Sequence, residues 1–428
     1  MRGGMLVFLK RIVRIYNETS LIARICIGLI AGAVCGILLP GVQFIAVLGD
    51  LFVGALKGIA PVLVFLLIAS SLAQGRAKLD KRFALVIILY LLSTLLASFV
   101  AVAGSFLFPQ TLVLAQGAEI ASSAPTGIGE VLHNLVMNAV SNPVASLSSA
   151  NYIGILAWAV LFGLALKKTA CEATKRFLAD VSQGCSHVVR LIINLAPFGI
   201  LGLVFSTVSQ NGLSVFKAYG SLVLLIVCSM LTVVLLVEPL VIWLTLRKNP
   251  YPLVFRCLKE SGITAFFTRS SAANIPINMA LCEKLGFDKD FYSVSIPLGA
   301  TVNMDGAAVT IAVMTLAAAH TLGISVDIPT ALILSLLATL GACGASGVAG
   351  GSLLLIPMAC SLFGIPNDIS MQVVGVGFII GVVQDSLETA LNSSGDAMMT
   401  ATAEYAQWKK EGKPLPAKLG TPLVNASC

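Results

Sequence analysis

The sequence predicts an all-α membrane protein that crosses the bilayer several times, and three observations support this fold class. Of its 428 residues, 57% are hydrophobic and only 11% are charged, and the mean hydropathy is +0.95. Apolar runs long enough for the roughly 30 Å hydrocarbon core recur along the chain. The runs are continuous rather than alternating apolar and polar, which excludes a membrane β-barrel.

Seven apolar runs are candidates for spanning helices. In chain order they cover residues 21–39, 51–72, 83–108, 152–166, 191–208, 222–246 and 373–383. The interval at 110–150 is polar and has no Lys or Arg, so we expect it to lie outside the cell.

Basic residues gather between the apolar runs and indicate topology. The clusters lie at 10–14, 76–82, 167–176, 247–248 and 409–418. Since Lys and Arg favour the cytoplasmic side of a membrane, this pattern places both termini in the cytoplasm. It also explains the net charge of +7 without a nucleic acid or an anionic partner. Lys217 is the one basic residue that this topology places outside.

The second half of the chain differs, because small and polar clusters interrupt its apolar segments. They are TRSSAANIP at 268–276, NMDGA at 303–307 and GACGASGVAGG at 341–351. Non-helical backbone inside a bilayer leaves polar groups unsatisfied, at several kcal/mol each, unless protein, water or a ligand occupies them. The clusters therefore predict a binding site.

Two of these clusters have the form of re-entrant hairpins. Segments 251–265 and 275–285 are each too short to span, so we expect them to enter from the cytoplasmic side and turn back at the Ser-rich cluster. Segments 329–340 and 352–363 repeat the pattern from the opposite side. Opposed hairpins of this kind are typical of inverted-repeat secondary transporters. The Gly-rich turn of the second is either a gate or a place where helices pack closely.

The last apolar helix carries an unusual set of polar side chains. Asp385, Glu388, Thr389, Asn392 and Asp396 recur at helical spacing and share one broad face. Because a charge at the bilayer centre costs at least about 2.5–3.5 kcal/mol, the three carboxylates predict cations, an amine or water beside them. The alternative is a solvated helix end.

The other two clusters offer polar groups of complementary kinds. Gly306 would permit an unwound turn, whose carbonyls, together with Asn303 and Asp305 oxygens, would suit a hard cation such as sodium. Asp-Gly is also an ordinary turn signal. Ser270 and Ser271 offer hydroxyl and N–H groups to a carboxylate at a helix N-terminus.

Several groups are set aside. Glu238 is an intramembrane acid without an identifiable partner, and a helix-end or inter-subunit role is as reasonable as a functional one. His133, His187 and His320 are isolated. The cysteines are scattered without ligand-like spacing. The basic segment 1–16 lacks a cleavage site and is expected to be an interfacial anchor.

Together with IPLGAT at 296–301 and DSLETALNSSGD at 385–396, the clusters resemble the dicarboxylate/amino-acid:cation symporter family. Within it, the bacterial members that couple serine or threonine to sodium are the most similar. The resemblance covers 20–408. It implies eight transmembrane helices and two re-entrant helical hairpins, built as inverted repeats in the glutamate-transporter (elevator) fold. It also implies a homotrimer in the inner membrane that transports rather than catalyses, with sodium as coupling ion and no other cofactor.

The same resemblance implies a division of the chain into a static scaffold and a moving transport domain. The scaffold would comprise helices 1–2 at 20–75, and helices 4–5 with the external segment at 110–211. The transport domain would comprise helix 3 at 83–109 and the remaining helices and hairpins at 215–408. Residues 1–19 would be an interfacial segment and 409–428 a cytoplasmic tail.

Site residues follow from matching motif positions. The resemblance places the substrate carboxylate on Ser271, Asn392 and the Ala345 backbone, with Ser270 beside them, and the substrate amine on Asp385, Thr389 and the Arg269 carbonyl. It implies three sodium sites: Gly299, Asn303, Asn392 and Asp396 in the first, Tyr90, Ser93, Thr94, Asn303 and Asp305 in the second, and the backbone of Thr301 and the Gly341 region in the third.

Two departures from the family pattern concern the substrate. Glu388 stands where members for acidic substrates carry an Arg, and Ala307 stands where they carry a Thr. An anion at this position would repel a second carboxylate, which favours serine or threonine. We expect Arg269 to be the partner of Glu388.

Three alternatives remain open. A symporter of the same fold could carry acidic amino acids or C4-dicarboxylates. An ion channel could also use re-entrant segments. An intramembrane aspartyl enzyme would need two apposed acids, for which Asp305 and Asp385 are the candidates.

Overall fold

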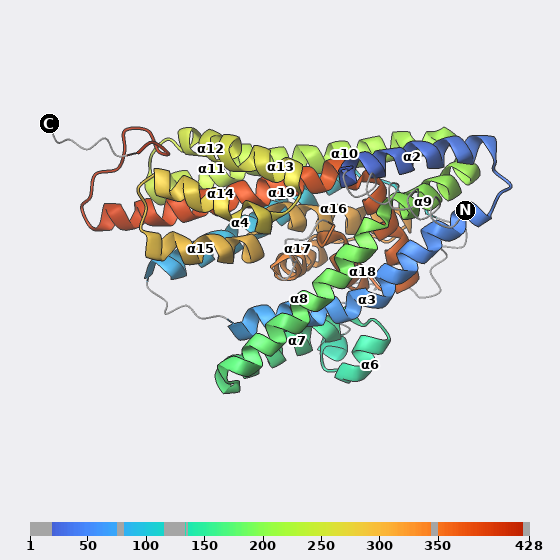
Figure 1. The fold of residues 1–428 in the computed structure, drawn as a ribbon, viewed down its shortest axis with the longest axis horizontal. Coiled ribbons are helices and arrows are strands. Elements are labelled where there is room, and N and C mark those ends of the chain that lie inside the picture. Colours follow the sequence, from blue (N-terminus) through green and yellow to red (C-terminus); the bar gives the residue numbers. More distant parts are fainter. Residues whose placement is uncertain (1–18, 75–80, 115–132, 134–135, 344–349, 423–428) are drawn as a thin grey trace, which may run out of the picture.

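The computed structural model describes residues 19–74, 81–114, 133, 136–343 and 350–422. Within these ranges every regular element is a helix and no strand is present, so the all-α prediction is confirmed. Figure 1 shows the helices as an elongated bundle with a second, smaller layer along one side.

The first half contains α2 (Leu21–Leu38), α3 (Phe44–Gln74), α4 (Lys81–Leu107), α6 (Pro143–Ser148), α7 (Tyr152–Thr169), α8 (Glu172–Asn194) and α9 (Ala196–Asn211). The second half contains η1 (Gly212–Ser214), α10 (Val215–Thr232), η2 (Val233–Val237), α11 (Glu238–Leu246), α12 (Tyr251–Cys257), η3 (Leu258–Gly262), α13 (Ile263–Thr268), α14 (Ser271–Lys284), α15 (Lys289–Val302), α16 (Asp305–Thr321), α17 (Ile328–Ala342), η4 (Ser352–Leu355), α18 (Ile356–Ser361) and α19 (Asn367–Lys410).

Among the described residues, six segments are long and apolar enough to cross a membrane. They are Phe44–Gln74, Arg82–Leu107, Tyr152–Thr169, Ala196–Leu246, Lys289–Thr321 and Asn367–Lys410. The chain is therefore a multi-pass membrane protein by length and composition. The 51-residue segment Ala196–Leu246 covers the predicted run 222–246 and most of the run 191–208, and η1 lies between the two. The apolar stretch Ala23–Leu38 of α2 is shorter than these segments, so the predicted count of eight helices and two hairpins stays a prediction.

A first group of helices, α2, α3 and α6–α9, packs mainly on itself. Glycines permit the closest contacts: a methyl group placed on Gly28 would lie 2.2 Å from Pro197 O, and one on Gly32 would lie 2.5 Å from Leu201 O. Both contacts join α2 to the backbone of α9. Small residues that let backbones approach are the usual means of helix association in lipid, where hydrophobic burial gives no net drive.

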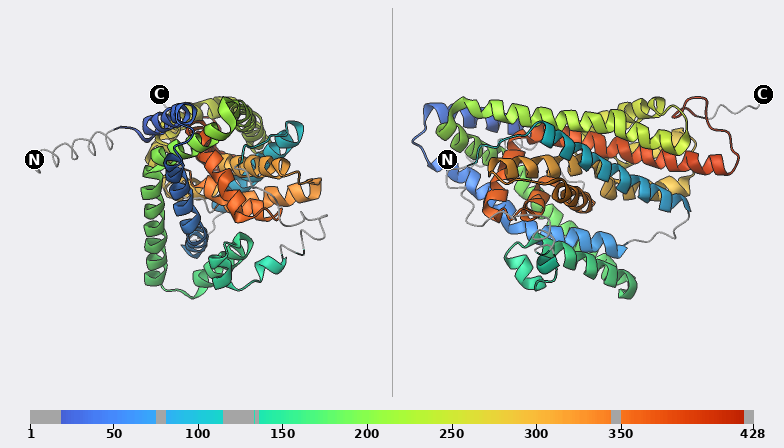
Figure 2. Two further views of the ribbon diagram at one scale, coloured as in Figure 1. Left: turned by 90° about the vertical axis from the view of Figure 1, so that its right-hand side faces the viewer. Right: turned by 180° about the vertical axis from the view of Figure 1, so that it is seen from behind.

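A second group consists of α4 and α10–α19 (Figure 2). Most of its helices pack against α16 or α19. In Lys289–Thr321, 94% of an apolar 18-residue window is buried, compared with 39% in Phe44–Gln74 of the first group. The α16 and α19 helices are thus shielded almost completely by protein, and polar side chains on them need not face lipid.

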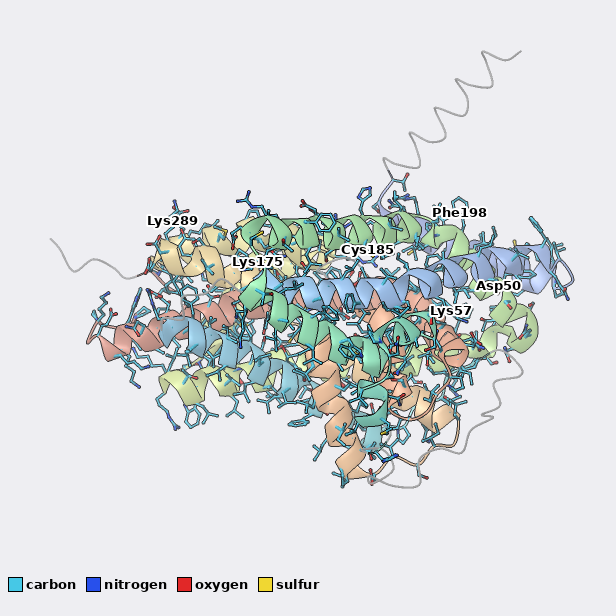
Figure 3. The ribbon with its side chains drawn as sticks, turned by 90° about the horizontal axis from the view of Figure 1, so that it is seen from below. Asp50, Lys57, Lys175, Cys185, Phe198 and Lys289 are labelled. Atoms are coloured by element: carbon cyan, nitrogen blue, oxygen red, sulfur yellow. The ribbon has the colours of Figure 1, made fainter. Side chains whose placement is uncertain are left out.

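The two groups meet along the N-terminal half of α19. Phe52 of α3 and Phe378 of α19 form an edge-to-face pair with centroids 5.1 Å apart. Lys57 of α3, labelled in Figure 3, forms an ion pair with Asp368 of α19. A cavity of about 340 Å³ lies beside these contacts and is lined by parts of both groups.

The first hairpin turns where the Ser-rich cluster predicts. The α13 helix ends at Thr268, Arg269 has a left-handed φ of +51°, and α14 begins at Ser271. Ser270 caps α14 by accepting a hydrogen bond from Ala273 N over 3.3 Å. In the second hairpin, residues 344–349 of the Gly-rich turn lie outside the described residues, and the chain is described again from Gly350.

The NMDGA cluster breaks a long helix in two, as predicted, but at a different residue. Helix α15 ends at Val302, Asn303 and Met304 are non-helical, and α16 begins at Asp305. The predicted role of Gly306 in the unwound turn is therefore wrong. Gly306 is helical and lets α16 approach α19, since a methyl group there would lie 2.7 Å from the Glu388 Cα atom.

Candidate functional site

The site lies where the helix breaks converge on α19. The polar face predicted for this helix is buried: Asp385, Glu388, Thr389, Asn392 and Asp396 are 1–6% exposed. These side chains face the α15–α16 break, the tip of the first hairpin and the start of η4, as their hydrogen bonds show below. The alternative of a solvated helix end is thereby excluded.

Asp305 joins α16 to α4. Its carboxylate accepts hydrogen bonds from Ser93 Oγ and from Thr94 Oγ1, the latter over 2.7 Å. The Thr94 hydroxyl also contacts the Tyr90 carbonyl oxygen at 2.9 Å. All of these residues are 0% exposed. The arrangement gathers hydroxyl, carbonyl and carboxylate oxygens, which are the ligand types of hard cations.

The α15–α16 break is tied to α19 through Asn392. Its Oδ1 accepts a hydrogen bond of 2.7 Å from Gly306 N, and its carbonyl oxygen accepts one of 3.2 Å from Asn303 Nδ2. Asn392 thus satisfies a free N–H at the start of α16, a group that a broken helix leaves without an intrahelical partner. The Asn303 Oδ1 atom has no hydrogen-bond partner among the described residues.

Asp396 lies one helical turn beyond Asn392 and is 1% exposed. Within the described part of the chain, neither of its carboxylate oxygens has a hydrogen-bond partner. Gly299 leaves room for it, since a methyl group there would lie 2.8 Å from Asp396 Oδ1 and equally close to the Tyr90 hydroxyl. That hydroxyl lies 2.9 Å from Thr400 Oγ1 and 3.1 Å from the Ser295 carbonyl.

Asp385 forms the ion pair at the first hairpin's tip. Arg269 Nε donates to Asp385 Oδ2 over 2.6 Å, and Gly350 N donates to Asp385 Oδ1 over 3.0 Å. The predicted pairing of Arg269 with Glu388 is therefore wrong. The left-handed turn at Arg269 starts its side chain from the hairpin tip, where Asp385 is the carboxylate within reach.

Glu388 is held instead by neutral donors. Its Oε2 accepts hydrogen bonds from Thr310 Oγ1 at 2.8 Å, from Ser352 Oγ at 2.9 Å and from Gln384 Nε2. Sequence reasoning missed all three donors. Gln384 lies one turn before Glu388 and could have been found by helical spacing, whereas Thr310 and Ser352 come from other elements.

The remaining predicted residues occupy varied positions. Thr389 Oγ1 donates to the Asp385 carbonyl within α19, 2.8 Å away. Ser271 is 3% exposed at the start of α14, and Ala307 is fully buried in α16. Thr301 is exposed near the end of α15. Ala345 lies outside the described residues.

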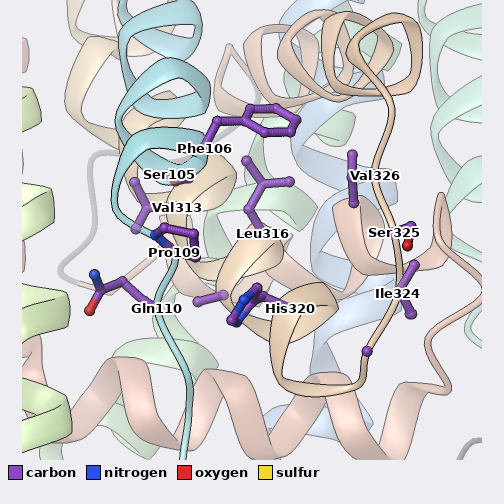
Figure 4. Close-up of a pocket in the computed structure, with 12 residues that line it drawn as sticks. Ser105, Phe106, Pro109, Gln110, Val313, Leu316, His320, Ile324, Ser325 and Val326 are labelled. Carbon is purple, nitrogen blue, oxygen red and sulfur yellow. The ribbon is translucent and has the colours of Figure 1, made fainter.

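Two cavities in the structure lie away from this site. One of about 430 Å³ lies between the C-terminal ends of α4 and α16, where Figure 4 shows Gln110 and His320. None of the predicted site residues lines it. Among the described residues, no group of three His, Cys, Asp or Glu side chains is arranged to hold a metal. The mixed carboxylate, amide, hydroxyl and carbonyl oxygens therefore fit an alkali cation better than a transition metal.

Comparison with known proteins gives consistent results. The profile of the sodium:dicarboxylate symporter family matches residues 21–405. The chain is 62% identical over 403 residues to the Serine/threonine transporter SstT of Bifidobacterium adolescentis, covering 94% of each chain. Two Streptococcus thermophilus proteins of the same name are 56% and 57% identical over 402 residues, covering 94% of this chain and all of each relative.

Proposed function

The chain belongs to the sodium:dicarboxylate symporter family, and we propose that it is a secondary transporter that takes up serine and threonine with sodium. Relatives with 56–62% identity over nearly their whole length bear the name of serine/threonine transporters. The family couples transport to sodium, which is carried cargo here and not a resident cofactor. We propose no catalytic step.

The observation that carries the substrate choice is the environment of Glu388. Its carboxylate is 6% exposed and lies one turn from Asp385. Hydroxyl and amide donors hold it, and it has no cationic partner among the described residues. A substrate with a side-chain carboxylate would place a second acid beside this one in a region of low dielectric, whereas a hydroxyl could donate to it. The pocket thus favours a small hydroxylated amino acid over aspartate or a dicarboxylate.

The ends of a zwitterionic substrate match the groups around Asp385. The amine would bind Asp385 Oδ1, with Thr389 and the Arg269 carbonyl nearby, and the carboxylate would bind Ser271, Asn392 and the Ala345 backbone. Gly350 N holds Asp385 Oδ1 in this structure. We therefore propose that the start of η4 moves away when the amine binds, so that the second hairpin acts as the gate.

Sodium would bind at the oxygens that already converge. The second site, at Asp305, Ser93 and Thr94, is the most complete, because its side chains are within hydrogen-bond distance of one another. The first site would use Gly299, Asn303, Asn392 and Asp396. The third, at Thr301 and the Gly341 backbone, has the fewest described contacts.

The packing of the helices suits a moving domain. All the proposed ligands belong to the second group of helices, and the first group contributes none. We propose that the second group carries substrate and sodium past a static first group, in a homotrimer of the inner membrane with both termini in the cytoplasm. The glycine-mediated contacts of α2 with α9 would keep the static group rigid.

Uptake into proteoliposomes tests this function. Purified full-length protein should accumulate labelled serine when an inward sodium gradient is imposed, and excess threonine but not aspartate should compete. Competition by aspartate as strong as that by threonine would favour an acidic-substrate symporter. Non-saturable flux would favour a channel.

The Glu388→Arg variant tests the placement of the pocket. Replacing the anion by a cation should weaken serine uptake and admit aspartate, because the side-chain end of the pocket would change sign. Serine kinetics identical to those of the wild type would place the pocket elsewhere.

A further inference from the structure

Glu238 is a buried acid that the proposed transport site does not use. It is the first residue of α11, directly after the π-helical turn η2, and it is 0% exposed. Neither of its carboxylate oxygens has a hydrogen-bond partner among the residues that the structure describes. Buried polar groups are nearly always satisfied in folded proteins, so an acid with two free oxygens requires an explanation. Single π turns often mark functional sites.

The position of Glu238 supplies that explanation. A methyl group placed on Gly395 of α19 would lie 2.7 Å from Glu238 Oε1 and 2.6 Å from Asn303 Nδ2. Glu238 and Asn303 therefore both contact the same glycine, and the residue that follows it is Asp396. The absence of a side chain at Gly395 is what allows the α11 carboxylate to reach the region of the first sodium site.

The ionisable groups placed near Glu238 by this contact are acids. Asp396 directly follows Gly395, and Asp305 lies two residues after Asn303. Within the described ranges, none of these three carboxylates takes part in an ion pair, whereas Asp385 nearby has Arg269. Three buried carboxyl groups without a cationic side chain can carry negative charge in the membrane interior only where cations bind them.

Three residues of this region have buried oxygens without hydrogen-bond partners among the described residues. They are both carboxylate oxygens of Glu238, both of Asp396 and the Oδ1 atom of Asn303. Carboxylate and amide oxygens are the ligands that hard cations prefer. The Asn303 amide donates through Nδ2 to the Asn392 carbonyl, so its oxygen remains available to a cation.

We propose that Glu238 supplies a carboxylate oxygen to the first sodium site, beside Asn303 and Asp396. The inference rests on the proposed function and extends it, because it adds a ligand from α11 to a site otherwise built from α15, the α15–α16 break and α19. It also doubles the number of carboxylates at that ion.

The test is the sodium dependence of serine uptake by the full-length Glu238→Gln variant in proteoliposomes. At saturating serine, the sodium concentration for half-maximal uptake should rise at least about tenfold, because the ion loses a charged ligand at close range in a low dielectric. The Glu238→Asp variant keeps the carboxylate, so its sodium concentration for half-maximal uptake should lie between those of the wild type and Glu238→Gln. Glu404→Gln is the matched control, since it removes another buried acid, which pairs with Arg82 far along α19, and should leave sodium dependence unchanged.

Several results would overturn the proposal. An unchanged sodium dependence of uptake by Glu238→Gln would do so. If the variant instead loses a pH dependence of uptake that the wild type has, Glu238 binds a proton in place of the ion. If Glu238→Gln does not transport, binding of radioactive sodium to the purified variant replaces uptake, and wild-type binding would contradict the assignment. A wild-type protein without sodium-dependent uptake would contradict the proposed function itself.

Discussion

Glycines serve opposite purposes in the two groups of helices. In the first group, Gly28 and Gly32 let α2 contact backbone oxygens of α9, so the space is filled by main chain. In the second group, Gly299, Gly306 and Gly395 stand against Asp396, Glu388 and Glu238, so the space is filled by carboxylates or by the helix that carries one.

The distribution of buried charge follows the same division. Among the described residues, every buried charged side chain belongs to the second group, namely Glu238, Arg269, Asp305, Asp385, Glu388, Asp396 and Glu404. The comparison teaches that small residues alone do not identify a site in a membrane protein. The helix interface becomes a site where the room left by glycine is taken by an ionisable group.

The largest effect is expected for Asp385→Asn. It leaves the buried Arg269 cation without its partner, which costs about 3–5 kcal/mol for pairs of this kind, and it removes the proposed amine ligand. Serine binding should be abolished and the unfolding temperature lowered, as measured by calorimetry of the purified protein. Asp368→Asn removes an exposed acid from the same helix and serves as control. Wild-type uptake by Asp385→Asn would remove the amine assignment.

A methyl group at either kind of glycine contact sharpens the comparison. Both Gly306→Ala and Gly32→Ala force backbones apart and should cost about 1–3 kcal/mol of stability. Only Gly306→Ala should also weaken serine and sodium binding, because it displaces Glu388 and the start of α16. Gly54→Ala, at a position with open space, should change neither quantity. Equal effects of both clashing variants on binding would erase the distinction between the groups.

A smaller effect is expected for Ser352→Ala. It removes one of the donors to Glu388, which costs about 1–3 kcal/mol when a buried charged acceptor loses a partner. Since Thr310 and Gln384 remain, serine uptake should persist with a raised half-saturation concentration. Thr339→Val, in α17 of the same hairpin and away from Glu388, is the control. An unchanged serine affinity would show that Ser352 does not shape the pocket.

The smallest effect is expected at the contact between the groups. Lys57 and Asp368 are 43% and 78% exposed, and exposed pairs contribute about 0–1 kcal/mol. Lys57→Met should therefore leave the unfolding temperature nearly unchanged. A large loss of stability would mean that the two groups are locked together, contrary to a moving second group.

The sequence predicted the breaks in the helices but not all the partners of the groups they expose. Apolar runs interrupted by Ser, Asn, Asp and Gly located the turns at Arg269 and Asn303, because local composition decides where a helix can end. Helical spacing likewise predicted the polar face of α19. These features depend on residues within one or two turns of each other.

Pairing between distant elements could not be predicted in the same way. Thr310 and Ser352 lie 78 and 36 residues from Glu388, and their contacts with it depend on how α16, η4 and α19 pack. The choice of Arg269 between Asp385 and Glu388, one turn apart, depends on the exact position of the hairpin tip. The approach of Glu238 to Gly395 joins α11 to α19, and no local pattern in the sequence indicated either this contact or the π turn before α11.

The central claim is that the polar groups at the helix breaks are completed by sodium and a neutral zwitterion. Isothermal titration of purified protein with serine, in sodium chloride and in choline chloride at equal ionic strength, tests it most directly. We expect saturable binding in sodium and none in choline. Equal serine affinity in the two salts would contradict the claim.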